Sequence, residues 1–167
     1  MATPEQIESA KEIIAYYTLL ASGTGAVPIP ASSGAIIAQN GVMFGHIAST
    51  LGAEISVSTI VESIGIAGSL NIAGRTFFIE GAKLLSWGTG SVWALAALSV
   101  LGATTAGVQT YILGRIAIEI GKNDGKALVP SATSKIIESA KNSYDAFIIE
   151  WKNKKPKQPQ GSGRSQT

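Results

Sequence analysis

The residues from Leu84 to Gly114 include no Asp, Glu, Lys or Arg over 31 positions. A hydrocarbon layer about 30 Å thick is crossed by roughly 20 helical residues, so this segment is long enough to span a bilayer. A second charge-free segment runs from Ile13 to Ala53 over 41 residues and contains the single histidine, His46. Two such segments in a chain of 167 residues predict association with a membrane.

The composition agrees with an apolar helical protein. Charged residues make up 14% of the chain, against roughly 25% in ordinary soluble domains, and the mean hydropathy is +0.27. The formal net charge of +2 does not indicate a nucleic-acid partner. The absence of cysteine excludes disulfides and thiol nucleophiles and agrees with a reducing compartment. Acidic residues near the N-terminus, where a secretory signal would be basic, predict no signal peptide.

The first helix is predicted from its capping residues. Thr3 is a suitable N-cap, Pro4 fits the first helical position and Gln6 can complete a capping box. The helix should be amphipathic for two turns, apolar afterwards, and end near the glycines of residues 23–25.

A reversal and a second helix should follow. Pro28 and Pro30 remove two backbone donors and disfavour helical backbone before them. Ser32 or Ser33 can then cap a helix that runs to about Leu51 and stops at glycine 52. This segment is long enough to cross a bilayer in company, although it would be a poor solitary span.

Three polar side chains interrupt this second helix: Gln39, Asn40 and His46. One hypothesis is that they line, together with Thr110, a wet path between copies of the chain, as in a channel. The other interpretation of His46 is a polar residue packed between helices, since no second His or Cys offers metal ligation.

Two weaker helices are expected over residues 56–70 and 72–85, followed by a turn at Gly88 and Gly90. The helix that begins at Ser91 carries small residues at steps of three or four along one face. These are Ala96, Ser99, Ala103, Gly107, Thr110 and Gly114. A small-residue stripe lets a membrane helix approach a neighbour closely, and we expect self-association there. The alternative is a helix buried at the centre of a soluble bundle.

The C-terminal part is more polar. Asn123, Asp124 and Gly125 predict a turn, and an amphipathic helix is expected from Pro130 to Trp151. We therefore divide the chain into a helical membrane-associated domain, residues 1–151, and a disordered basic tail, residues 152–167. The tail favours a cytoplasmic C-terminus.

No catalytic, metal or cofactor site is predicted. The segment from Gly121 to Ala127 has one spacer residue too few for a phosphate-binding loop and ends in Ala where a hydroxyl is needed. Nucleotide hydrolysis is therefore not expected, and the carboxylates form no pair within the charge-free segments.

Two blocks of the sequence carry a recognisable arrangement of turns and helices. The first, LLASGTGAVPIPASSGAIIAQNGVMFGHIASTLGAEIS, has Pro28, Pro30, Gln39, Met43 and Gly52 at its marked positions. The second, KLLSWGTGSVWALAALSVLGATTAGVQTYILGRIAIEIG, has Gly88, Gly90, Thr110 and Gly114. With these motifs the chain resembles the hydrophobic GTPase-associated domain family, a family of unknown function found attached to, or encoded beside, GTPases of the Era and dynamin type. It departs from the family at Ser32 and Ser33, where many members have an acid.

The resemblance implies an all-α, membrane-associated bundle with apolar helical hairpins and amphipathic terminal helices. Because the chain contains no GTPase domain, a GTPase would be a separate partner. We expect a non-enzymatic bacterial protein of the inner or an internal membrane that self-associates and scaffolds, organises or remodels it. The alternatives are an oligomeric pore and a soluble helical adaptor.

Overall fold

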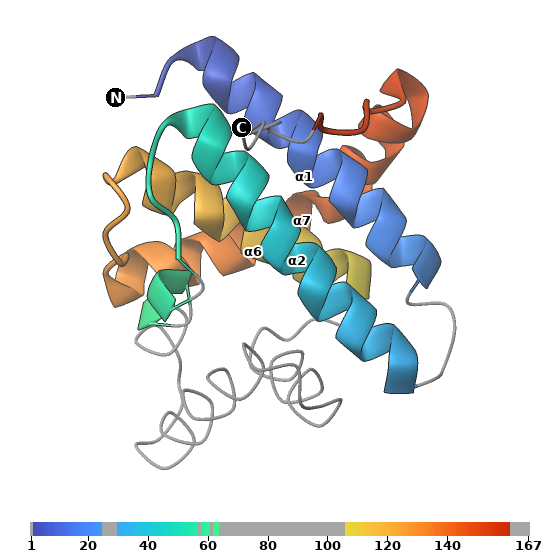
Figure 1. Cartoon of the computed structure of the whole chain (residues 1–167), viewed down its shortest axis with the longest axis horizontal. Coiled ribbons are helices and arrows are strands. Elements are labelled where there is room, and N and C mark those ends of the chain that lie inside the picture. Colours follow the sequence, from blue (N-terminus) through green and yellow to red (C-terminus); the bar gives the residue numbers. More distant parts are fainter. Residues whose placement is uncertain (1, 25–29, 57, 61, 64–105, 161–167) are drawn as a thin grey trace, which may run out of the picture.

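In the computed structural model, the described residues form four long helices and no strand (Figure 1). The description covers residues 2–24, 30–56, 58–60, 62–63 and 106–160. The helices are α1 (Pro4–Thr24), α2 (Pro30–Leu51), α6 (Ala106–Lys122) and α7 (Pro130–Lys154). The predicted all-α class is therefore confirmed for this part of the chain.

The start of α1 shows the predicted capping box. The backbone N–H of Gln6 donates to Thr3 Oγ1 at 3.2 Å, and the N–H of Thr3 donates to Gln6 Oε1 at 2.8 Å. Each residue thus satisfies a donor that the helix itself leaves without a partner.

Glycines end two of the helices as the sequence indicated. Gly52, with φ +63°, follows α2, and Gly125, with φ +77°, follows α6. The N–H of Gly125 donates to the carbonyl of Ile120 at 2.9 Å, which closes the end of α6. The start of α2 differs from the expectation, because the helix begins at Pro30 and not at Ser32 or Ser33. A proline fits there since the first helical N–H needs no partner.

Helix α6 lies at the centre of the bundle. Its Ile112, Ile116 and Ile120 are fully buried in one core with Ile14 of α1 and Ile47 of α2. Figure 1 shows α1 and α2 as a hairpin beside α6, with α7 crossing behind. This central position explains why the first half of α6 can be free of charge.

The expectation of membrane-spanning helices is not supported among the described residues. Among the described residues, no helix has both the length and the hydropathy needed to cross a bilayer. This includes α2, which we expected could cross in company. Of the segment from Leu84 to Gly114, only the part from Ala106 is described, and it continues as α6 to Lys122. The predicted helix at residues 72–85, most of the one at 56–70, and Pro28, Gly88, Gly90, Ala96, Ser99 and Ala103 lie outside the described residues.

The C-terminal helix extends further than expected. Helix α7 continues past the buried Trp151 to Lys154 and ends where the N–H of Lys155, at φ 54°, donates to the carbonyl of Trp151. The chain then turns back toward α1, and the N–H of Lys157 donates to Glu12 Oε1 at 3.0 Å. Residues 152–160, which we assigned to a disordered tail, therefore have defined contacts as far as they are described.

Candidate functional site

The glycines of α6 lie where other helices approach most closely. A Cβ atom on Gly114 would lie 2.6 Å from Ile14 Cγ1 of α1, and one on Gly107 would collide with the hydroxyl groups of Ser22 and Tyr144. Both glycines thus face side chains of the same chain. The small-residue stripe, over its described half, is a packing surface within the bundle.

Three glycine contacts and one hydrogen bond define how the helices are aligned in the bundle. Gly107 faces Ser22 and Gly114 faces Ile14, so α1 and α6 run in opposite directions. Thr110 pairs with Asn40, and Gly121 approaches Leu51, so α2 runs parallel to α6.

The polar residues of α2 differ in their surroundings. The Thr110 hydroxyl donates to Asn40 Oδ1 at 2.9 Å, and both side chains are buried. Gln39 Nε2 donates to the carbonyl of Tyr17 at 3.1 Å and links α2 to α1. His46 is half-buried, its ring centroid 6.0 Å from that of Tyr17. Gln39 and Asn40 thus serve as links between helices in this arrangement.

A first groove, of about 550 Å³, lies between α1, α2 and the C-terminal segment. His46 and Glu12 line its walls, and residues 157–160 form its third side. Tyr17 packs nearby in the core, where burial, and then the adjacent Tyr16, raise the pKa of its phenol above 10.0.

A second groove, of about 620 Å³, lies between α1, α6 and α7, and contains the half-buried Arg115. Arg115 Nη1 donates to the hydroxyl of Tyr111 at 3.0 Å and lies 3.5 Å from Ser143 Oγ. The guanidinium also lies 5.7 Å from the centre of the Tyr111 ring. The ring of Phe147 packs against that of Tyr111, with centroids 4.4 Å apart.

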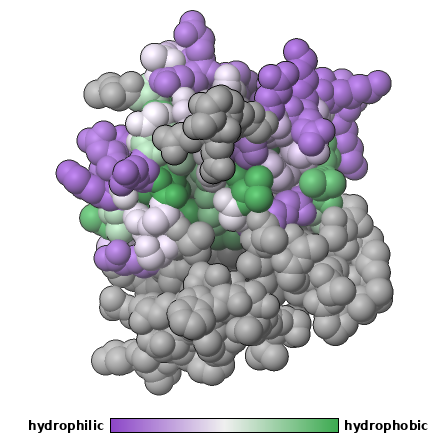
Figure 2. Space-filling view, in the orientation of Figure 1, coloured by the Kyte–Doolittle hydropathy of each residue, from purple (hydrophilic) through white to green (hydrophobic). Residues whose placement is uncertain are grey.

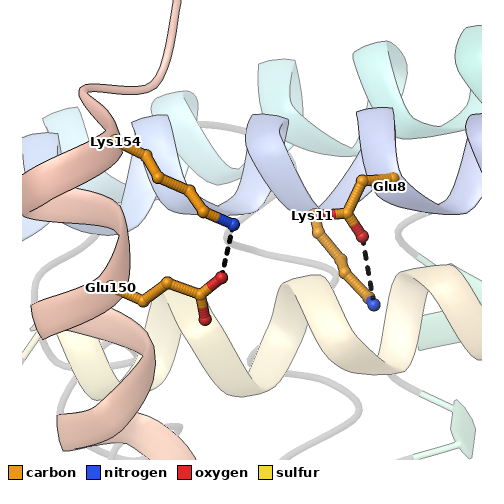
Figure 3. A network of polar contacts seen from close by, with 4 residues as sticks. All are labelled: Glu8, Lys11, Glu150 and Lys154. Carbon is orange, nitrogen blue, oxygen red and sulfur yellow. Dashed lines mark hydrogen bonds and ion pairs between the residues drawn. The ribbon is translucent and has the colours of Figure 1, made fainter.

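Ion pairs occupy the rims of this second groove. Glu8 pairs with Lys11 on α1 at 3.3 Å, and Glu150 pairs with Lys154 on α7, as Figure 3 shows. The hydrogen bond to Glu150 raises the pKa of the Lys154 amine above 10.5, against a smaller lowering by burial. On α6, Lys122 and Glu119 pair at 2.8 Å. Each of these carboxylates therefore has a lysine partner.

Sequence reasoning missed the Arg115 groove. One signal was available, since Tyr111 and Arg115 are four residues apart on a helix and lie on one face. Ser143 and Phe147 come from a helix more than 25 residues further along, and nothing in the sequence placed them opposite Arg115. Within the described residues, no group of three or more His, Asp or Glu side chains could hold a metal ion.

Comparison of the chain with protein-family models, with curated proteins and with solved structures finds no match.

Proposed function

We propose that this chain is a non-enzymatic helical protein that inserts one end of its bundle into a membrane, self-associates there and scaffolds or remodels the bilayer. A separate GTPase is the partner that the family resemblance suggests. The observation that carries the proposal is the distribution of charge along the packed helices.

The charge-free halves of three helices lie side by side. All charged residues of α1 lie at or before Glu12, and all those of α6 lie at or after Arg115. Because α1 and α6 run in opposite directions, with Ser22 beside Gly107, their charge-free halves share one end of the bundle. Helix α2 has no charged residue at all. Figure 2 shows hydrophilic residues along the top and the left of this view and hydrophobic residues nearer its middle.

The dimensions of this end suit one leaflet. At a rise of 1.5 Å per residue, the segment Ile13–Thr24 of α1 is about 18 Å long and the segment Ala106–Gly114 of α6 about 13 Å. The hydrocarbon layer is about 30 Å thick, so these halves reach to about its middle. Insertion to that depth needs no spanning helix among the described ones. In the sequence, the rest of the charge-free segment, from Leu84, directly precedes α6.

Vesicle binding tests the proposal. The full chain should float with phospholipid vesicles and stay with them through a carbonate wash. Leu20, 45% exposed on the charge-free half of α1, is the residue to change, and Ile149, 64% exposed on the charged α7, is the matched control. Leu20→Glu should lower partitioning at least about tenfold, because a carboxylate is costly in hydrocarbon. Ile149→Glu should leave it within about twofold. Complete release of the wild type by carbonate would refute the proposal.

Self-association needs its own measurement. Because Gly107 and Gly114 already contact α1 and α7 of the same chain, an oligomer contact on the stripe has to use Ala96, Ser99 or Ala103. Ala103→Leu should then lower the mass measured by light scattering in detergent. An unchanged mass would remove the stripe from the interface.

A further inference from the structure

We infer that the groove between α1, α6 and α7 binds a phosphate group, with Arg115 as its receptor. The inference does not depend on membrane insertion.

A chain of hydrogen bonds orients the guanidinium from one side. Ser143 Oγ lies 2.8 Å from the carbonyl of Ser139, and a carbonyl can only accept, so the serine proton is used there. Tyr111 must then donate its own proton to Ser143 Oγ, 3.0 Å away. The Tyr111 oxygen is left to accept from Arg115 Nη1. Each hydroxyl has one fixed role, so Nη1 has a fixed position.

The other edge of the guanidinium makes no hydrogen bond within the ranges that the structure describes. Arginine offers five N–H donors, and only Nη1 has an acceptor within the described part of the chain. The Nε and Nη2 groups form the planar fork that binds phosphate or carboxylate oxygens through two parallel hydrogen bonds. Since the protein already orients the fork, little side-chain entropy remains to be lost on binding.

The charge of the groove also favours an anion. Its three carboxylates, from Glu8, Glu119 and Glu150, are each paired with a lysine. Arg115 forms no ion pair with any residue in the described ranges. Lys11, Lys122 and Arg115 line the groove beside these three carboxylates, and Lys154 pairs with Glu150 from outside the lining. Arg115 is therefore the cation that these ion pairs leave without a carboxylate partner.

The residues that line the groove indicate which kind of substituent the phosphate group carries. The ring of Phe147 packs against Tyr111 at 4.4 Å and against Trp151 at 6.2 Å, which gives one side an aromatic surface. A volume of about 620 Å³ is within the range of roughly 300–1,000 Å³ that holds small organic ligands. The groove thus suits a phosphate ester with an apolar substituent. Such a group can come from a phospholipid or from a free phosphate ester.

Titration of the full chain with two probes separates these sources. The probes are inorganic phosphate and dihexanoyl phosphatidic acid below its micelle concentration, followed by calorimetry or tyrosine fluorescence. We expect saturable binding of the lipid probe. Phosphate binding of similar strength would assign the site to free phosphate, whereas much weaker phosphate binding would assign it to the lipid. Either result supports a phosphate receptor.

Variants test the role of Arg115. Arg115→Gln should weaken binding at least tenfold, and Arg115→Lys, which keeps the charge but loses the fork, should weaken it severalfold. The matched control is Lys126→Gln, which removes the same charge from an exposed position that does not line the groove and should change affinity less than twofold. Ala146→Glu places a carboxylate on an exposed, lining position of α7 without removing any contact, and should block binding in a folded protein.

Two results would overturn the inference. The first is no saturable binding of either probe to the wild type. The second is an equal loss with Arg115→Gln and Lys126→Gln, which would mean attraction by net charge alone.

Discussion

Replacing Gly114 by alanine adds one methyl group at the closest approach of α1 and α6. The new Cβ would lie 2.6, 3.0 and 3.1 Å from the Cγ1, Cδ1 and Cγ2 atoms of Ile14. Ile14 is fully buried in the core, so it has no solvent into which to turn. Either the isoleucine leaves its rotamer or the two helices move apart, and both change the packing of the whole core.

Two opposing contributions set the size of the effect. Alanine favours the helix over glycine by about 1 kcal/mol, whereas overpacking a core costs about 1–3 kcal/mol. The difference is a loss of about 0–2 kcal/mol, and because three contacts are all too short we expect Gly114→Ala to lower the free energy of unfolding toward the upper end of that range. Gly41 of α2 is the control, because it is exposed and a Cβ there meets nothing within 4 Å. Gly41→Ala should raise the same quantity by about 0.5–1 kcal/mol.

Denaturant unfolding followed by far-ultraviolet circular dichroism measures both variants under the same conditions. A double-mutant cycle with Ile14→Ala then isolates the contact between α1 and α6. Ile14→Ala alone should cost about 2–5 kcal/mol. In the Gly114→Ala background it should cost at least about 1 kcal/mol less, because the added methyl occupies part of the vacated space. If Gly114→Ala stabilised the protein as much as Gly41→Ala does, the close approach would be refuted.

Three further changes test other contacts. Thr110→Val leaves Asn40 Oδ1 without its buried donor and should cost about 1–3 kcal/mol, whereas adding Asn40→Leu should recover part of that loss in the same unfolding assay. Burial raises the pKa of Tyr17 above its unfolded value, so its contribution to stability is present below pH 10 and is lost as the pH rises through the folded pKa. Tyr17→Phe should therefore show a smaller fall in unfolding free energy between about pH 9 and pH 11 than the wild type, and equal falls would contradict the assignment. Thr3→Ala removes half of the capping box and should cost about 1 kcal/mol, seen also as faster amide exchange at Gln6; unchanged exchange would refute the cap.

The sequence predicted helix ends better than it predicted helix partners. The cap at Thr3 and the stops at Gly52 and Gly125 depend on local backbone chemistry, which a few adjacent residues determine. Pro30 shows the limit of this reasoning, because serine capping and proline at the first helical turn both fit that segment. The end of α7 was placed too early, since the lysines after Trp151 suggested a solvated tail although they also suit a helix C-terminus.

The candidate site could be predicted only in part. Gly107, Thr110 and Gly114 were identified by spacing as a surface for close packing, but spacing does not say which helix packs there. A small-residue face suits another copy of the chain and another helix of the same chain equally well. Asn40 shows the same ambiguity, because its hydrogen bond to Thr110 depends on the parallel arrangement of α2 and α6.

The antiparallel packing of α1 and α6 places Arg115 at the boundary of the charge-free end of the bundle. Gly114 faces Ile14, so Arg115, the first charged residue of α6, lies close to the level of Glu12, the last charged residue of α1. If the charge-free end enters hydrocarbon, the fork of Arg115 lies near the depth at which the lipid phosphates begin. The two ideas remain separable, because Leu20→Glu acts on insertion alone and Arg115→Gln acts on soluble phosphate. Loss of vesicle binding in both variants, with loss of soluble-probe binding only in Arg115→Gln, would join them in one surface that holds the bundle at a fixed depth.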